Sequence, residues 1–159
     1  MTIEGPRACR QEELDSAIDL ADRVFRVGWR SSMRDDFPLL FAESNLDRLR
    51  VFSDGGRVVS LVGMVERDIL LLGTRHVSCC IGAVCTEPDY RGQGLATRLL
   101  RDAMERALGE GVDIFLISGG RGLYRRLGFV DVGSYWTCEV DRTALPPKCR
   151  YTVRDWRPE

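Results

Sequence analysis

The order of the elements expected from the sequence indicates a mixed α/β fold: a strand, helices, three antiparallel strands, and then helix, strand, helix and strand. Three observations lead to this prediction. Residues 94–108 carry apolar side chains at spacings of three and four, the pattern of an amphipathic helix. Residues 113–118 are almost continuously apolar, as a buried parallel strand is. Asp54-Gly55-Gly56 lies between two strand-like runs and predicts a hairpin.

The remaining elements follow from hydrophobic periodicity and from the glycines and prolines that end each run. The expected helices span residues 12–25, 94–108 and 121–127, and segment 29–41 has room for a short one. The expected strands span residues 7–10, 48–53, 57–66, 68–72, 75–86, 113–118 and 130–140.

The length and composition fit one soluble domain. The chain has 159 residues, of which 44% are hydrophobic and 30% charged, and its net charge is −1. This balance gives no bulk attraction to nucleic acid or to a membrane surface. No apolar run reaches the roughly eighteen residues of a membrane span, and residues 1–6 do not resemble a signal peptide. We therefore expect a cytoplasmic protein.

The reactive side chains exclude several chemistries. None of the six cysteines forms a Cys-x-x-Cys pair and the only histidine is His76, so no metal site is expected. Cys79, Cys80 and Cys85 lie in a strand-like run, and we expect them to be reduced. Lys148 is the only lysine among 23 basic residues, which nearly excludes a lysine base.

A glycine turn joins the strand that ends near Cys85 to helix 94–108. The first turn of a helix has unpaired backbone N–H groups and partial positive charge, and both suit a phosphate. Gly92 and Gly94 allow a close approach of the backbone, and Arg91 adds a charge. The Rossmann pattern G-x-G-x-x-G fails because position 97 is Thr, and the lysine of a P-loop is missing.

Two segments resemble motifs of the GNAT superfamily of N-acetyltransferases. Arg91-Gly92-Gln93-Gly94-Leu95-Ala96 is similar to its coenzyme A pyrophosphate loop, Q/R-x-x-G-x-G/A. Leu123-Tyr124-Arg125-Arg126-Leu127-Gly128-Phe129 resembles its aromatic-Tyr-x-x-x-Gly-Phe segment. The looser resemblance covers about residues 6–140 and implies the GNAT fold. That fold has a twisted, mostly antiparallel sheet of six to seven strands, about four helices, and central strands that splay apart around the cofactor.

The resemblance also implies the ligands. Acetyl-CoA is the expected co-substrate, and a primary amine of a small molecule or peptide is the expected acceptor. Backbone N–H groups of the loop would hold the pyrophosphate, and the strand edge would pair with the pantetheine amides. The expected cofactor-binding residues are Val84, Cys85, Thr86, Arg91, Gly92, Gln93, Gly94, Leu95, Ala96, Thr97 and Ser118.

Tyr124 is the expected general acid by the same resemblance. A phenol with a pKa near 10 is protonated at neutral pH and suits a leaving thiolate with a pKa near 8.5. The base is less clear, because the position of the glutamate used by some family members is Ser78 here. His76 lies two residues away on the same strand face and is the expected base, with Glu66 as a weaker candidate.

Segment 29–41 flanks the active cleft in the family. Trp29, Phe37 and Phe41 are therefore expected to line the acceptor pocket, with a hydrophobic lid as the alternative. Asp35 and Asp36 either attract a cationic acceptor or form a solvated acidic loop.

The domain prediction is one acetyltransferase domain over residues 1–145. Residues 146–159 form either a last strand of the sheet or the start of a second domain. The second reading resembles the tandem, enhanced-intracellular-survival type of acetyltransferase. The sequence allows a homo-oligomer but does not predict one. The alternative function is a non-catalytic acyl-CoA-binding module or one half of a larger tandem acetyltransferase.

Overall fold

The structure, a computed structural model, describes residues 3–133. Contacts group the chain into one unit that ends at Phe129 and a second that begins at Val130. The first unit holds strands β1 (Ile3–Ala8), β2 (Leu49–Asp54), β3 (Arg57–Leu71), β4 (Thr74–Thr86) and β5 (Ile114–Ile117). Its helices are α1 (Leu14–Phe25), α2 (Met33–Asp36), α3 (Leu95–Gly109) and α4 (Gly122–Arg126), with 3₁₀ turns at Gln11–Glu13, Glu43–Arg48 and Pro88–Tyr90.

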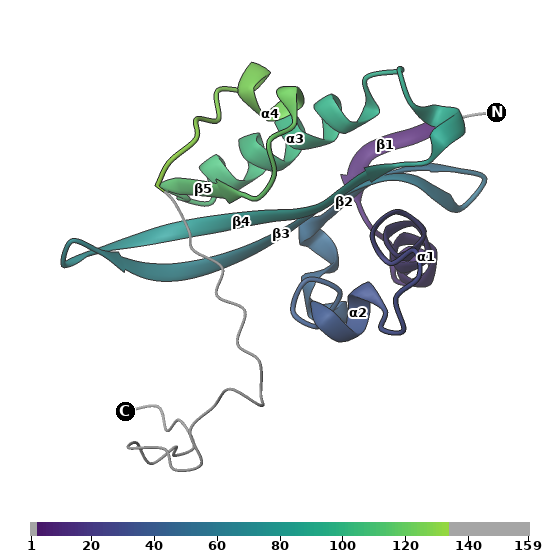
Figure 1. Cartoon of the computed structure of the whole chain (residues 1–159), viewed down its shortest axis with the longest axis horizontal. Helices are drawn as coiled ribbons and strands as arrows, with labels where there is room; N and C mark the ends of the chain where they lie inside the picture. Colours follow the sequence, from purple (N-terminus) through teal and green to yellow (C-terminus); the bar gives the residue numbers. More distant parts are fainter. Residues whose placement is uncertain (1–2, 134–159) are drawn as a thin grey trace, which may run out of the picture. The chain divides into compact units, whose positions relative to one another are not determined.

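The five strands form one sheet in the order β1-β2-β3-β4-β5. All neighbours are antiparallel except β4 and β5, which are parallel and are joined through α3. Helices α1 and α2 lie on one face of the sheet, and α3 and α4 lie on the other (Figure 1). The mixed α/β fold expected from the sequence is confirmed. No helix within residues 3–133 is long and apolar enough to cross a membrane.

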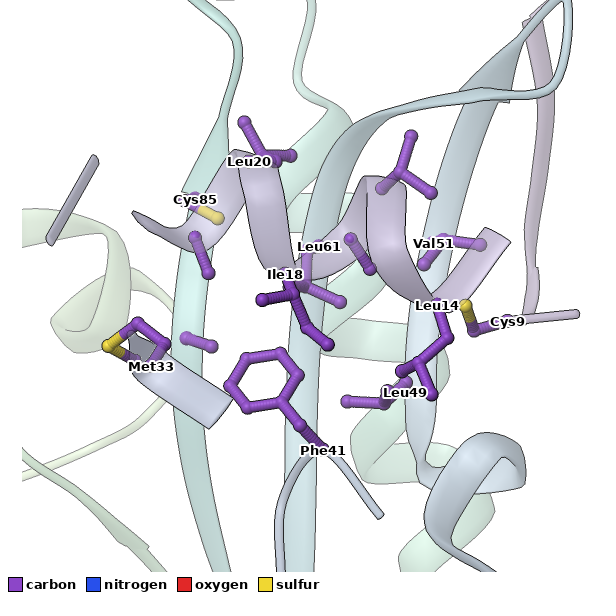
Figure 2. Close-up of a cluster of buried hydrophobic side chains, with 14 of the residues drawn as sticks. Cys9, Leu14, Ile18, Leu20, Met33, Phe41, Leu49, Val51, Leu61 and Cys85 are labelled. Atoms are coloured by element: carbon purple, nitrogen blue, oxygen red, sulfur yellow. The ribbon is translucent and has the colours of Figure 1, made fainter. Parts of the chain in front are cut away.

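The core is divided by the sheet into two clusters. On one face, α1 buries one stripe of its surface against β2, β3 and β4 (Figure 2). On the other face, the stripe of α3 packs on β3 and β4. The buried residues of α1 are Leu14, Ala17, Ile18, Leu20 and Ala21, and those of α3 are Leu95, Leu99, Leu100, Ala103 and Ala107.

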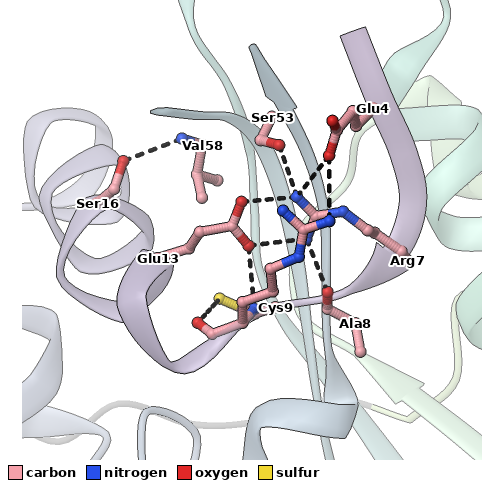
Figure 3. A network of polar contacts seen from close by, with 9 residues as sticks. Glu4, Arg7, Ala8, Cys9, Glu13, Ser16, Ser53 and Val58 are labelled. Carbon is pink, nitrogen blue, oxygen red and sulfur yellow. Dashed lines mark hydrogen bonds and ion pairs between the residues drawn. The ribbon is translucent and has the colours of Figure 1, made fainter. Parts of the chain in front are cut away.

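A buried ion pair fixes the start of α1 to the edge of the sheet (Figure 3). Glu13 is only 2% exposed, and its two carboxylate oxygens accept hydrogen bonds from Arg7 at 2.6 and 2.7 Å. Burial by itself raises the pKa of Glu13, but the bonds from Arg7 and from the Arg10 backbone outweigh burial and hold this pKa below its usual value. The carboxylate therefore stays ionised and keeps β1 joined to α1.

Several predicted boundaries were wrong. The runs 57–66 and 68–72 are one strand, β3, because its backbone pairs with β4 without a break from Gly63 to Leu71. Polar Arg67 and Asp68 interrupt the hydrophobic pattern but not the backbone pairing. The first strand covers Ile3–Ala8 rather than 7–10. Within residues 3–133 the sheet has five strands rather than six or seven.

The expected strand at 130–140 has a different outcome in its two parts. Its first four residues, 130–133, have no regular secondary structure. The rest of that strand, the domain boundary at 145 and the final segment 146–159 lie outside the described residues.

The four cysteines within residues 3–133 form no disulfide with one another. Cys9, Cys79 and Cys85 are buried, and burial raises the pKa of each thiol to about 12. Cys80 is exposed. We therefore expect iodoacetamide at pH 8 to modify Cys80 at least about a hundredfold faster than the three buried thiols, because only thiolates react.

Peptide mapping by mass spectrometry after short exposures measures this difference. Protein unfolded in urea is the control, since all four thiols should then react at similar rates. Equal labelling of Cys85 and Cys80 in the folded protein would contradict the burial argument.

Candidate active site

The site begins where β4 and β5 separate. Parallel pairing between them ends at Ile81 and Ile117. On its other side β4 contains a β-bulge, because Gly63 pairs with Gly82 while Leu61 pairs with Cys85. Ala83, inside the bulge, has a φ of +50°. From this point to Thr86, β4 has an edge that no strand within residues 3–133 covers.

The backbone groups of this edge point alternately toward β3 and toward the open side. The Glu87 N–H donates to the carbonyl of Val59 at 2.9 Å, so Glu87 and Cys85 direct their backbone groups toward β3. The alternation of a strand then turns Val84 and Thr86 to the open side. Their carbonyls accept hydrogen bonds from Arg121 Nη1 at 3.4 Å and from Arg91 Nε at 3.1 Å, respectively.

The glycine turn leads from this edge into α3. Gly92 and Gly94 have φ values of +77° and +73°, a conformation that side chains with a Cβ rarely adopt. Gly94 is the N-cap of α3 and has no side chain to cap the first N–H groups. A Cβ at Gly94 would meet no atom within 4 Å, so the surface above it is open. The turn therefore presents helix N–H donors to a neighbouring anion.

A cavity of about 600 Å³ lies against the β4 edge and the glycine turn. Among residues 3–133, its charged lining residues are Arg91, Arg121 and Arg126, and none of its lining residues is acidic. Three fixed positive charges beside helix N–H donors suit a ligand with several negative charges. The described residues that line it are Val24, Val84, Cys85, Thr86, Tyr90, Arg91, Gly92, Gly94, Leu95, Ala96, Thr97, Arg121, Leu123 and Arg126.

Tyr124 lies on α4 beside two lining residues, Arg121 and Leu123. Its side chain is 6% exposed and contacts Phe129 edge to face, with ring centroids 6.2 Å apart. Burial raises the pKa of the Tyr124 phenol, and nearby Arg121 opposes this only in part. No residue within 3–133 accepts a hydrogen bond from its hydroxyl. The phenol is therefore protonated at neutral pH and has its proton free to donate.

The structure brings together nine of the eleven expected cofactor-binding residues around this cavity. Gln93 and Ser118 are exposed and do not line it. Sequence reasoning missed Val24, Tyr90, Arg121, Leu123 and Arg126 as lining residues. Arg121 and Arg126 could have been found from the sequence. They lie on either side of Tyr124 with no acidic residue close by in the sequence, which indicates arginines available to bind an anion.

The position of His76 contradicts its expected role as the base. His76 pairs with Ile69 near the far end of the β3–β4 hairpin and lies 3.8 Å from Asp113. It is eight residues before Val84 on one strand, which separates the two by roughly 26 Å. A side chain at that distance cannot take a proton from an amine at the cavity.

The two other base positions do not supply a base either. Ser78 is buried, and its hydroxyl donates to the carbonyl of Arg67 at 3.0 Å. Glu66 pairs across the hairpin with Cys79, and its carboxylate bonds to Arg48 at 2.6 Å. It lines a separate cavity of about 320 Å³ near the start of β2.

Trp29, Phe37 and Phe41, the residues expected to line the acceptor pocket, do not line the 600 Å³ cavity. Phe41 is 2% exposed and belongs to the core beneath α1, so its expected pocket role is wrong (Figure 2). Trp29 and Phe37 are exposed, and both rings contact the Arg26 guanidinium, at 5.3 and 5.6 Å. Arg26 also pairs with Asp36 at 2.6 Å. These aromatic rings already hold a cation of the chain itself.

Comparison with known proteins places these features in context. A family model described as acetyltransferase (GNAT) domain matches residues 6–131. A search of proteins with curated functions finds no match.

Solved structures share the fold. A predicted acetyltransferase from Clostridium acetobutylicum, with acetyl-CoA, has a TM-score of 0.69 at 16% identity and covers 87% of this chain and 96% of its own. An acetyltransferase from Trypanosoma brucei has a TM-score of 0.66 at 19% identity, over 87% of this chain and 100% of its own. A GCN5-related N-acetyltransferase from Kribbella flavida has a TM-score of 0.66 at 24% identity, but the match covers 80% of this chain and only 32% of its own.

Proposed function

Because this chain belongs to the GNAT acetyltransferase domain family, we propose that it transfers the acetyl group of acetyl-CoA to a primary amine of a small molecule or peptide. One observation carries the proposal: the open β4 edge, the glycine turn and three arginines surround one cavity. Acetyl-CoA has an amide-containing arm and several phosphates. The cavity offers complementary groups for both parts.

Each part of the cofactor has residues suited to hold it. N–H groups from Gly94 to Thr97, together with Arg91 and Arg126, would hold the phosphates by charge-assisted hydrogen bonds. Backbone groups of Val84 and Thr86 face the open side and would pair with the two amides of the arm, as an added strand does. The thioester would then lie near the bulge at Ala83, where the two strands part.

In the proposed reaction, the amine nitrogen attacks the thioester carbonyl and forms the amide bond as the carbon–sulfur bond breaks. The departing thiolate takes its proton from the Tyr124 hydroxyl. The raised pKa of Tyr124 keeps this group in its acid form at neutral and mildly alkaline pH. The amine loses its own proton to water, since neither His76 nor Glu66 lies at the cavity.

A non-catalytic acyl-CoA-binding module is the second candidate, and Ser78 favours it. The serine stands where some family members have a glutamate, and it is engaged with Arg67. Release of coenzyme A thiol from acetyl-CoA, measured against a panel of primary amines, separates the two functions. Amine-dependent thiol release supports the enzyme, whereas cofactor binding without any release supports the module.

The pH profile tests the absence of a nearby histidine base. We expect log kcat/KM to rise with pH toward the pKa of the acceptor amine, near 10.4 for an alkylamine, because only the neutral amine attacks. His76→Gln should keep kcat/KM within about twofold of the wild type at each pH, because His76 lies roughly 26 Å along β4 from the cavity. The measurement is initial rates from pH 6 to 9.5.

Arg75→Gln, which changes the neighbouring exposed residue of the hairpin, is the matched control. A rising limb near pH 6.5 that disappears in His76→Gln but persists in Arg75→Gln would return the base to His76.

A further inference from the structure

The open edge of β4 has two outward carbonyls, and each accepts a hydrogen bond from an arginine that lines the cavity. Thr86 is held by Arg91, from the glycine turn, and Val84 by Arg121, from the N-cap of α4. An unpaired backbone acceptor at a strand edge is unfavourable unless water or a side chain serves it. The two arginines therefore take the place that hydrogen-bond donors of a neighbouring strand would have.

We propose that Arg121 is a displaceable cap on the Val84 carbonyl. An amide N–H of the pantetheine arm takes over this carbonyl, and the released guanidinium turns to the phosphates of the same cofactor. This inference rests on the proposed function, because it assigns a positioning role within the acetyl-CoA site.

The geometry favours Arg121 over Arg91 for this exchange. The Arg121 bond measures 3.4 Å, close to the limit for a hydrogen bond, whereas the Arg91 bond measures 3.1 Å. The weaker bond is the easier one to replace. The Arg121 guanidinium occupies the Val84 carbonyl directly, so its departure frees that acceptor.

The exchange conserves hydrogen bonds and improves one of them. The Val84 carbonyl keeps one donor throughout, first a guanidinium N–H and then an amide N–H. The guanidinium leaves a neutral acceptor and gains an anionic one, and its planar set of donors matches a phosphate. Pantetheine, which has the amide-containing arm but no phosphate, must still displace Arg121, but it gives the released guanidinium no anion to bind.

The inference predicts opposite effects of one substitution on two ligands. In Arg121→Ala, pantetheine should bind about twofold to tenfold more tightly, the range for one hydrogen bond, because no cap competes for Val84. Coenzyme A should bind more weakly, by about tenfold, because a phosphate contact is lost. Isothermal titration gives the coenzyme A affinities, and competition against coenzyme A gives those of pantetheine.

Arg126→Ala is the matched control. Arg126 lines the same cavity, but it forms no hydrogen bond or ion pair with any residue from 3 to 133. Its loss should weaken coenzyme A binding and leave pantetheine unaffected. Melting curves confirm that both variants are folded, and Arg121→Met, which keeps the alkyl part of the side chain but has no hydrogen-bond donor, replaces Arg121→Ala if the latter unfolds.

The possible results distinguish failure of the Arg121 proposal from failure of the proposed acetyltransferase function. Pantetheine binding that is tighter in Arg121→Ala but unchanged in Arg126→Ala supports Arg121 as a cap on the Val84 carbonyl. Pantetheine affinity that is unchanged or weaker in that variant, or no competition by pantetheine in any variant, overturns the cap while coenzyme A binding stands. A wild-type protein that binds neither coenzyme A nor acetyl-CoA overturns the proposed function itself, and the cap with it.

Discussion

Tyr124→Phe should lower kcat by about a hundredfold to ten-thousandfold, the span for losing a general acid. Affinity for coenzyme A should stay within a few-fold, because the Phe ring keeps the place of the Tyr ring and the residues that line the cavity are unchanged. The stability of the protein should be equal or higher, since Phe fills the same volume and no residue within 3–133 accepts the hydroxyl. Steady-state rates, titration calorimetry and a melting curve on one preparation test all three. Loss of kcat with binding retained identifies an interaction made mainly in the transition state.

Tyr90→Phe provides the matched control for removing a phenol. The Tyr90 ring lines the cavity, but its hydroxyl donates to Asp54 at 2.8 Å. We expect this variant to lose stability rather than kcat. Near-normal turnover in Tyr124→Phe would remove Tyr124 from the mechanism and favour the binding module.

Gly94→Glu should reduce coenzyme A affinity by more than about a hundredfold. The new carboxylate would stand at the N-cap of α3, next to the N–H groups proposed to hold the phosphates, and its charge would repel them. Space alone does not prevent the substitution, because a Cβ at Gly94 meets nothing within 4 Å. Calorimetric titration with coenzyme A measures the loss.

The left-handed conformation at Gly94 adds a cost that needs its own control. Gly73→Glu places the same side chain at a φ of +81°, at the tip of the β3–β4 hairpin. Both variants should lose about 1 kcal/mol of unfolding free energy from this conformation. Only Gly94→Glu should lose the cofactor, and equal affinity in the two variants would refute the assignment of the phosphate site.

The helices and the parallel strand were predictable because their patterns are local. The apolar stripe of α3 and the run at β5 appear where the sequence placed them. The length of β3 was not predictable, because its outer half is stabilised by backbone pairing with β4 and both faces there are largely exposed. Hydrophobic periodicity carries no signal for such a strand.

The part of the site that depends on local backbone conformation was predictable. The part that depends on distances between residues far apart along a strand or a loop was not. Gly92, Gly94 and Arg91 form a recognisable sequence pattern, and they line one cavity together with the β4 edge. His76 was misassigned because sharing a strand face says nothing about separation along the strand. The acceptor role of Trp29 and Phe37 stays a prediction, and their contact with Arg26 was not predictable because it depends on a loop whose course the sequence does not specify.

The arginine lining of the cavity has a consequence for the fate of the donor. A thioester acetylates any neutral amine nearby, and a lysine among other positive charges would lose its proton more readily and become an internal acceptor. Residues 3–133 contain no lysine, and the three charged lining residues are arginines, which stay protonated at every pH the protein meets. Under the proposed function, the walls formed by residues 3–133 attract acetyl-CoA without offering it a lysine amine, so this part of the chain has no lysine that the bound donor could acetylate.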